Sequence, residues 1–322
     1  MKLAEMKTDF NGRKKLYLFG KKVFSYKKMS EYDKIYAKRY DGLTSEELAV
    51  CIKKQFEKAL GYELNLDNPQ TFNEKLNWCK LYYHNPLMTI CADKVKGRDY
   101  FLQKTADDGS HLVRQLGVYS SVDEIDLAKL PSKFVLKSNW GSGLQIIVAD
   151  KNSFDFEAAK EKMTKWLDIH SNHYYMAFEY GYKHIEPKIV CEEFLEFEYK
   201  LEFFCFNGKA QFFWVVFDDK TEKVHADFYT LDWQKMPVRH KYLNSDVVLP
   251  RPSYFDEMLK TAEKLCGDFP FVRCDFYKTA DSWRFSEMTF YHWAALQKFS
   301  PEKYDFEFGK MIQLPEKMVE GE

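Results

Sequence analysis

The pattern of hydrophobic and polar positions changes once along the chain, close to residue 131. Before that point, apolar residues recur at helical spacing between stretches rich in Gly, Asn and Pro, so this part is predicted to be mainly helical. Thr71, with Glu74 three residues later, is typical of a capping box and marks the start of one helix. The helices are expected over residues 44–60, 71–85 and 93–104.

After residue 131 the apolar residues form short runs separated by polar and turn residues, which is typical of β-strands. The runs are KFVLK, QIIV, KIVCEEFLE, LEFFCFNGKAQFFWVVF, HADFYTL, FVRCDFY and SWRFSEMTF. Within the longest run, Asn207 and Gly208 can supply the two positive φ angles of a type I′ turn, which predicts a hairpin. Charged helices are expected over residues 154–170 and 253–269. The predicted fold class is α+β, with a mostly antiparallel β region and helices packed on it.

Composition narrows the class of protein. The chain has 322 residues, of which 45% are hydrophobic, and a net charge of -1. It is long enough to bury a large core, and its charge gives no argument for a nucleic-acid partner. Its seven cysteines include no CxxC pair, so we expect buried, reduced thiols and a cytoplasmic location. No apolar run approaches the roughly 18–20 residues of a membrane span, and the first residues lack the apolar core of a signal peptide.

Residues 11–30 carry seven Lys or Arg and no acidic residue, interleaved with aromatic and aliphatic side chains. One interpretation is a peripheral contact with an anionic membrane surface, at the inner face of the membrane. The other is a short hairpin, KLYLFGKKVFSYKK, that turns at Phe19 and Gly20 and exposes its lysines to water. The sequence leaves both interpretations open.

A glycine loop lies between two of the predicted strands, in FVLKSNWGSGLQIIV. P-loops and Rossmann loops lead from a strand into a helix, whereas this loop returns into a strand. A glycine loop between antiparallel strands can cover phosphate groups with its backbone N–H groups. Lys137, directly before the loop, can contact an inner phosphate as a point charge. The alternative is an ordinary hairpin with a surface lysine.

Two predicted strands near the C-terminus carry charged residues inside apolar runs. Because side chains alternate across a strand, Arg273 and Asp275 share one face of their strand, as Glu287 and Thr289 do on the next. Two buried carboxylates without partners would be costly, and a Mg²⁺ ion that bridges nucleotide phosphates would satisfy them. Arg273 would suit a phosphoryl group or a developing oxyanion. The alternative is a buried ion-pair network of Arg, Asp and Glu.

In their order and spacing, seven stretches resemble the TupA-like ATP-grasp family of polysaccharide-biosynthesis proteins. They are NPQTFNEKLNW, ADKVKGRDYF, FVLKSNWGSG, CEEFL, FCFNGK, VRCDFY and FSEMTF, and the resemblance runs from about residue 41 to residue 306. It implies an ATP-grasp fold, in which two α+β lobes with antiparallel sheets hold ATP between them, plus a helical N-terminal part. The implied domains are a basic aromatic arm (1–41), a mainly helical subdomain (42–130), a small lid lobe with the glycine loop (131–192) and a C-terminal lobe with the metal site (193–322).

The resemblance also implies roles for individual residues, with ATP and Mg²⁺ as cofactors. Arg273 and Lys137 would be the catalytic residues, and Lys94 and Lys137 the two phosphate-contacting lysines. Arg98 matches a family arginine to which no role is assigned. The metal ligands would be Asp275, Glu287 and Thr289. The nucleotide-binding residues would be Lys94, Lys137, Asn139, Gly141, Ser142 and Gly143, together with the adenine hinge formed by Glu192, Glu193, Phe194 and Leu195.

Three departures from the family pattern stand out. Trp140 replaces a histidine in the glycine loop, and Lys200 and Glu202 stand where the family has Asp and Lys. The exchange at Glu202 removes a cation near the nucleotide. The third departure is the segment YHWAALQKF at 291–299, which lacks the usual glycine.

The activity implied by the resemblance is that of a carboxylate–amine ligase in surface polysaccharide biosynthesis, of capsule, lipopolysaccharide or teichuronic type. The acid would be a sugar carboxylate such as a uronic acid, linked to a nucleotide, a lipid or a polysaccharide, and the partner an amine or amino acid. One alternative is a glycosyltransferase of the same pathway, although no DxD motif is present. Another is a degenerate nucleotide-binding module, which Glu202 favours. His170 and His173 have zinc-ligand spacing, but we expect two solvated histidines at a helix end.

Overall fold

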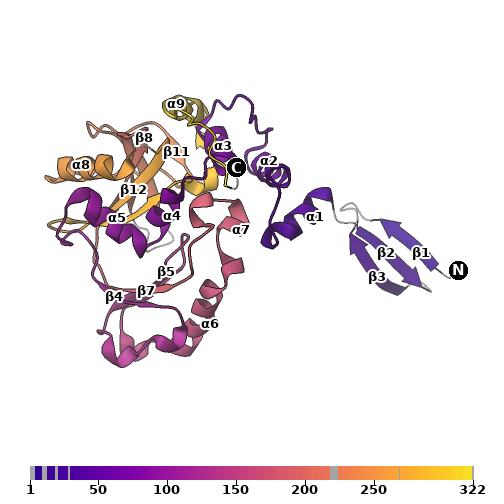
Figure 1. Ribbon diagram of the computed structural model, residues 1–322, viewed down its shortest axis with the longest axis horizontal. Helices are drawn as coiled ribbons and strands as arrows, with labels where there is room; N and C mark the ends of the chain where they lie inside the picture. Colours follow the sequence, from indigo (N-terminus) through magenta and orange to yellow (C-terminus); the bar gives the residue numbers. More distant parts are fainter. Residues whose placement is uncertain are drawn as a thin grey trace. The chain divides into compact units, whose positions relative to one another are not determined.

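The computed structural model describes residues 4–8, 13–18, 21–27, 30–217, 224–267 and 269–320. It divides into two compact units, Met1–Lys54 and Gln55–Glu322. The helix α2 (Ser45–Leu60) carries the chain from the first unit into the second (Figure 1). Among the residues with a described position, no helix combines the length and the apolar character that crossing a membrane requires.

The first unit contains a three-stranded antiparallel sheet, in which β1 (Ala4–Thr8), β2 (Arg13–Leu18) and β3 (Lys21–Lys27) are neighbours in chain order. Pairing of β2 with β3 confirms the predicted hairpin, and the predicted turn at Phe19 and Gly20 lies outside the described residues. The helix α1 (Glu31–Ala37) follows. Contact of residues 11–30 with a membrane stays a prediction.

The larger sheet of the second unit has five antiparallel strands in the order β10-β9-β8-β12-β13. The turn between β8 and β9 has positive φ at both Asn207 and Gly208, as predicted for a type I′ hairpin. The helix α8 (Phe255–Cys266) packs on this sheet. The strands are β8 (Tyr199–Phe206), β9 (Lys209–Phe217), β10 (His225–Thr230), β12 (Phe271–Lys278) and β13 (Trp283–Thr289).

A second sheet has four antiparallel strands in the order β4-β7-β5-β6. They are β4 (Gln115–Tyr119), β5 (Phe134–Ser138), β6 (Gln145–Val148) and β7 (Ile189–Glu193), and α6 (Phe156–Leu167) packs against them. The predicted boundary at residue 131 cuts through this sheet, because β4 belongs to the stretch expected to be helical. The short run QLGVY contains a glycine and gave no strand signal.

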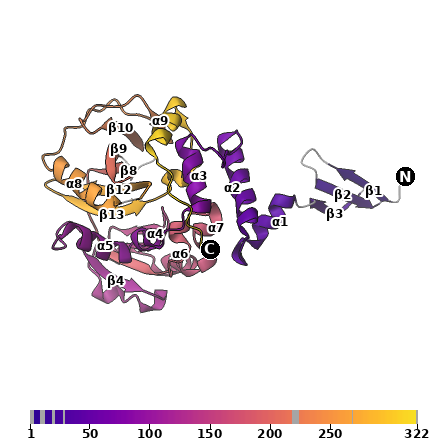
Figure 2. The same cartoon turned by 45° about the horizontal axis from the view of Figure 1, so that its top comes forward.

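The helices α4 (Pro86–Ala92) and α5 (Lys96–Thr105) lie between the two sheets in both views, whereas α3 (Phe72–Tyr82) lies beside the larger sheet, next to its C-terminal elements (Figures 1 and 2). The capping box of Thr71 and Glu74 is present, as predicted. Asn85 and Pro86 were expected to end a helix, but they open α4, since the Asn85 side chain caps it. The helix α9 (Lys303–Met311) packs on α3, so this predicted helical subdomain shares one core with the C-terminal sheet.

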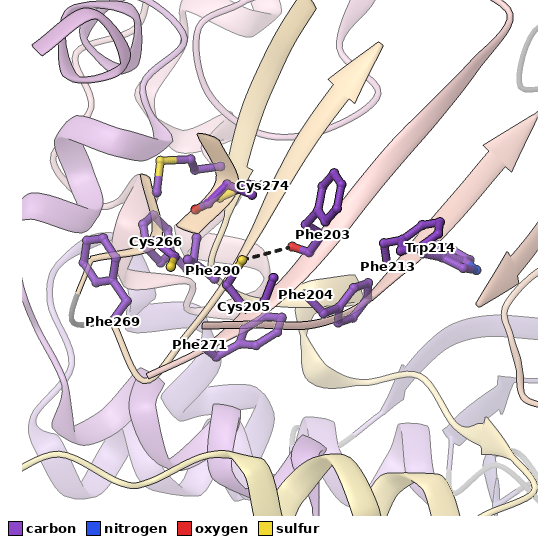
Figure 3. Packing of buried hydrophobic residues seen from close by; sticks show 14 of the residues in the cluster. Phe203, Phe204, Cys205, Phe213, Trp214, Cys266, Phe269, Phe271, Cys274 and Phe290 are labelled. Carbon is purple, nitrogen blue, oxygen red and sulfur yellow. Dashed lines mark hydrogen bonds between the residues drawn. The ribbon is translucent and has the colours of Figure 1, made fainter. Parts of the chain in front are cut away.

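Aromatic side chains fill the core of the large sheet. Figure 3 shows Phe203, Phe204 and Phe271 around the thiol of Cys205, whose Sγ lies 3.8 Å from the backbone oxygen of Phe203. All seven cysteines are free and buried, which confirms the predicted buried thiols. The remaining short strands, β11 (Arg239–His240) and β14 (Phe299–Ser300), pair with each other at the edge of this core.

Candidate functional site

A cavity of about 650 Å³ is lined by residues of both sheets of the second unit. The structure therefore brings together segments that lie up to 200 positions apart in the sequence, from Lys94 to Ala294. Nine residues with a predicted role line this cavity: Lys94, Lys137, Gly141, Ser142, Gly143, Arg273, Asp275, Glu287 and Thr289.

The strand β12 and its neighbour β13, at the edge of the larger sheet, place the charged residues side by side. In the antiparallel register of β12 and β13, Arg273 lies opposite Thr289, and Asp275 lies opposite Glu287. All four residues line the cavity, which confirms that they share one face of the sheet. The surrounding residues of these strands are apolar and buried, so the charged face is held rigidly at the cavity wall.

Arg273 is the centre of a buried ion-pair network. Its guanidinium donates to both carboxylate oxygens of Asp275, over 2.8 and 2.6 Å, and lies 3.1 Å from Glu202. Its Nη1 atom donates to Nδ1 of the buried His292 over 2.6 Å. Burial alone would lower the pKa of Arg273, but Asp275 and Glu202 outweigh it and raise the pKa. The alternative interpretation of a buried network is therefore present in the structure.

The two predicted phosphate lysines are also paired. Lys94 lies 3.1 Å from Glu287 and donates to the backbone oxygen of Gly141 over 2.7 Å. Lys137 lies 2.5 Å from Glu192. Burial would raise the pKa of Glu287, but Lys94 and Arg273 outweigh burial and lower it. The three cations with a predicted role, Lys94, Lys137 and Arg273, thus each have a carboxylate partner within the protein.

The glycine loop joins β5 to β6, and its backbone requires glycine. Gly141 and Gly143 have φ of 72° and 74°, in the left-handed region that other residues rarely adopt. A Cβ atom at Gly141 would also lie 3.0 Å from Nδ1 of His173. Ser142 between them is exposed, and all three loop residues line the cavity. The position fits the predicted role of a phosphate cover.

Asn139 does not line the cavity and is fully buried. Its side-chain amide donates to Asp93 and to the backbone oxygen of Glu186, and its Oδ1 atom accepts from the backbone of Lys188. Its backbone oxygen accepts from the N–H of Lys94. This set of bonds corrects its predicted role, because Asn139 positions Lys94 and has no amide atom left for a nucleotide.

The predicted adenine hinge lies apart from the large cavity. Glu192 is engaged with Lys137 and lies 3.8 Å from Arg98. The backbone N–H of Glu193 donates to the backbone oxygen of Arg114, directly before the pairing of β4 with β7. Glu193, Phe194 and Leu195 line a second cavity of about 240 Å³, with Ser110, Leu112, Val113, Arg114 and Arg284. Sequence reasoning did not identify Arg98 as the second cation beside Glu192.

The three departures from the family pattern lie on the wall of the cavity or directly behind it. Glu202 joins the network of Arg273, and Lys200 lines the cavity. Trp140 is fully buried and packs edge-on against His173, so the expectation of two solvated histidines is wrong for His173. His170 is exposed, as expected.

The segment without glycine adopts a left-handed turn. Trp293, Ala294 and Ala295 have φ of 48°, 53° and 53°, which is uncommon for residues other than glycine. The turn is pinned by α3, because Lys80 donates to the backbone oxygen of Ala294 and Asn77 to that of Ala295. Trp293 and Ala294 line the cavity. Asn77 and Lys80 are buried polar residues three positions apart on α3. This pattern in the sequence indicated a buried polar contact, and it was not recognised.

The carboxylates of the cavity are candidate ligands for a divalent cation. Within the described parts of the chain, no group of three or more His, Cys, Asp or Glu side chains is arranged to hold a metal. Asp275 and Glu287 nevertheless offer two carboxylates on neighbouring strands, with the Thr289 hydroxyl on the same wall. Mg²⁺ is commonly held by one or two carboxylates together with substrate phosphates and water. The residues therefore fit a Mg²⁺ ion that arrives with a nucleotide.

Comparison with solved structures returned matches of low sequence identity. The chain matches an N5-carboxyaminoimidazole ribonucleotide synthetase in an ADP complex at 10% identity, over 63% of this chain and 46% of that chain, with a TM-score of 0.41. It matches the Staphylococcus aureus N5-carboxyaminoimidazole synthetase with ADP at 10% identity, over 86% and 60%, with a TM-score of 0.40. It matches the Bacillus anthracis D-alanine–D-alanine ligase with ATP at 14% identity, over 74% and 68%, with a TM-score of 0.39. The chain thus spans about half the length of the first of these proteins.

No protein of curated function matches the chain. A family profile described as TupA-like ATPgrasp matches residues 74–313, which is well over half of the chain and includes both sheets and the cavity between them. The chain therefore belongs to the TupA-like ATP-grasp family, as its motifs predicted.

Proposed function

We propose that the protein is an ATP- and Mg²⁺-dependent carboxylate–amine ligase of surface polysaccharide biosynthesis, which forms an amide on a sugar carboxylate such as a uronic acid. The observation that supports this proposal most is the single cavity wall on which Lys94, Lys137, Arg273, Asp275 and Glu287 meet beside the glycine loop. Membership of an ATP-grasp family makes ATP the expected nucleotide and disfavours a glycosyltransferase.

The proposed reaction has two steps. A carboxylate oxygen of the sugar attacks the γ-phosphorus of ATP, which gives an acyl phosphate and ADP. The amine then attacks the acyl carbon, forms the C–N bond and releases inorganic phosphate. The protein supplies no nucleophile, so its contribution is to position the substrates and neutralise charge.

The charged residues have distinct parts in this scheme. Lys94 and Lys137 neutralise the phosphate groups, and Arg273 neutralises the phosphoryl group as it is transferred. Asp275 and Glu287 would hold Mg²⁺, which neutralises charge on the phosphates when it is bound. The hinge residues Glu192 to Leu195 would contact the adenine in the second cavity. A smaller cavity, lined by Leu112, Val113, Lys94, Lys137 and Glu192, lies between this cavity and the phosphate-binding residues.

Nucleotide binding requires these ion pairs to change partners. Lys94 now contacts Gly141 and Glu287, and Lys137 contacts Glu192. Phosphate oxygens would replace the Gly141 carbonyl as a partner of Lys94, which frees the glycine loop to settle over the nucleotide. A phosphate bound by several N–H groups and two lysines is a stronger acceptor than the neutral carbonyl it replaces.

The test uses D-glucuronic acid as the acid probe and glycinamide as the amine probe. ADP release from MgATP should require the acid, and hydroxylamine should trap the acyl phosphate as a hydroxamate. The matched control is Asp275→Asn/Glu287→Gln, which keeps the side-chain shapes and removes both carboxylates. ADP release that is independent of the acid, or equal in the control, would contradict the proposal.

A second candidate is a nucleotide-binding module without catalysis. It is favoured by the position of Arg273, which contacts both Asp275 and Glu202. Arg273 and the proposed metal ligand Asp275 are thus already bound to each other. Such a module would bind MgATP but release no ADP with any acid and amine. The same assay therefore separates the two functions.

A further inference from the structure

Three buried polar groups line the cavity without a partner of their own. The indole Nε1 of Trp214 and the hydroxyl of Tyr291 make no hydrogen bond to any described residue, although these residues are only 2% and 3% exposed. Glu179 is 8% exposed, and its carboxylate forms no hydrogen bond or ion pair with any residue of known position. Buried polar groups are nearly always satisfied, so this part of the wall is built to receive a polar ligand.

Glu179 is held in a defined position. It follows the helix α7 (Tyr174–Ala177), after Phe178 reverses the chain with a positive φ of 56°. Its backbone oxygen accepts from the N–H of Tyr182, and the buried Asn172 donates to the backbone oxygen of Tyr182. The carboxylate therefore faces the cavity from a fixed turn rather than from a free loop.

The groups around Glu179 suit a cation. Tyr182, Tyr291 and Trp293 line the same cavity, and aromatic faces attract cations. The charged or titratable groups within electrostatic range of Glu179 are Lys80, Tyr182 and Tyr291. Lys80 is buried and directs its ammonium at the carbonyl of Ala294, over 2.7 Å. Lys80 and Glu179 are not within ion-pair distance, so the carboxylate keeps its capacity to accept hydrogen bonds.

Tyr182 links this region to the phosphate wall. Its phenol is within electrostatic range of Glu179 and also of Glu287 and Asp275. A ligand that contacts Glu179 therefore lies in the same cavity as the residues proposed to hold Mg²⁺ and the acyl phosphate.

We propose that Glu179 binds the ammonium group of the amine substrate and takes its proton. This inference rests on the proposed ligase function. The ammonium donates to the Glu179 carboxylate and lies against the aromatic wall. One proton passes from nitrogen to Glu179, and the neutral nitrogen attacks the acyl carbon. The C–N bond forms as the bond from carbon to the phosphate oxygen breaks, and the electron pair leaves with the phosphate. The second proton that nitrogen must lose passes to the departing phosphate, and Glu179 returns its own proton to water before the next turnover. The substrate class at this part of the cavity is therefore a primary amine in its ammonium form.

The protonation behaviour of Glu179 agrees with this role. Burial raises the pKa of Glu179 to about 7, although Lys80 acts in the opposite direction. A general base is most effective when its pKa lies near the working pH. The carboxylate is the proton acceptor, so amide formation should rise with pH through about 7 and then level off.

The test compares two amines in Glu179→Gln and wild type, with MgATP and D-glucuronic acid. Glycinamide, with an α-amine pKa of about 8, is mostly protonated near neutral pH, whereas hydroxylamine is mostly neutral and needs no base. We expect the ratio of amide to hydroxamate to fall roughly 100-fold or more in Glu179→Gln, the usual size of a general-base effect. In the variant, the amide rate should follow the fraction of neutral glycinamide instead of levelling off.

A second variant separates catalysis from a structural role. If Glu179 only balances the charge of Lys80, the double variant Lys80→Met/Glu179→Gln should recover the wild-type ratio. If Glu179 is the base, the double variant keeps the low ratio. An unchanged ratio in Glu179→Gln, or recovery in the double variant, overturns the inference. A wild-type protein that forms neither hydroxamate nor amide instead overturns the proposed function, and the inference with it.

Discussion

The cavity wall has two regions that differ in whether their polar groups have partners within the protein. On the phosphate wall, defined by Lys94, Lys137, Arg273, Asp275 and Glu287, every charge is paired with another residue. On the amine wall, defined by Glu179, Trp214 and Tyr291, the buried polar groups have no partner of their own. Both regions line one cavity and are held by well-packed elements.

The difference indicates how each region meets its ligand. On the phosphate wall a ligand must exchange one set of ionic partners for another, so strong binding needs a highly charged group such as a nucleotide with its cation. On the amine wall a ligand only has to supply partners that are missing, so a small ligand with one or two polar groups is sufficient. The charges of the phosphate wall thus have partners within the protein, whereas the polar groups of the amine wall have none among the described residues.

The largest loss of stability is expected from Arg273→Met. Removing this cation leaves Asp275 and Glu202 buried without it, and breaking a buried pair by deleting one partner costs about 3–5 kcal/mol. The matched control is Arg114→Met, because Arg114 pairs with Glu193 at the exposed surface, 3.0 Å away. That change should alter the free energy of unfolding by about 1 kcal/mol or less. Urea titration of both variants measures this, and equal losses would show that the network of Arg273 contributes no more than a surface pair.

The glycine loop should respond unequally at its two glycines. Gly143→Ala places a side chain in open space, so it should cost only the left-handed backbone, roughly 1–2 kcal/mol. Gly141→Ala has the same backbone cost and also presses a Cβ atom against His173, which should add about 1–3 kcal/mol. Thermal unfolding of the two variants gives the difference, and adding His173→Ala to Gly141→Ala should remove it. Equal effects would mean that His173 does not restrain the loop.

The smallest change in the free energy of unfolding is expected from Tyr291→Phe, and this change should not be destabilising. Its hydroxyl is buried without a partner, which costs about 1–3 kcal/mol, so its removal should leave the ligand-free protein equally stable or slightly more stable. The control is Tyr100→Phe, since the hydroxyl of Tyr100 donates to the backbone oxygen of Leu265 over 3.0 Å. That variant should lose about 1 kcal/mol. Equal losses in urea titrations would show that the Tyr291 hydroxyl is already satisfied and would remove it from the amine wall.

The phosphate wall was predictable from sequence because its residues carry strong local signals. Arg273 and Asp275 interrupt an apolar strand at alternate positions, and a two-residue period fixes which side chains share a face. The turn at Asn207 and Gly208 was predicted to have positive φ, and the structure has it there and also at the loop glycines Gly141 and Gly143. The signals were local, so they did not depend on the packing of distant segments.

The amine wall could not be predicted, because its residues become neighbours only in the folded chain. Glu179 lies in a segment without helical or strand period, and its direction depends on the left-handed backbone of Phe178. Trp214 has the sequence pattern of any core residue in a strand. Asn139 was misassigned for a related reason, since its buried contacts come from residues 46 and 49 positions away. Tertiary contacts of this range leave no periodic signal in the sequence.

The central claim is that the phosphate wall binds a nucleotide with Mg²⁺ through Asp275 and Glu287. The most direct measurement is the thermal stabilisation by ATP, with and without Mg²⁺, of the wild type and of Asp275→Asn/Glu287→Gln. At a ligand concentration of 100 times the Kd, binding should add about 2.7 kcal/mol of stability. We predict a Mg²⁺-dependent shift in the wild type that is lost in the double variant. An equal shift in both proteins, or none in the wild type, would contradict the account.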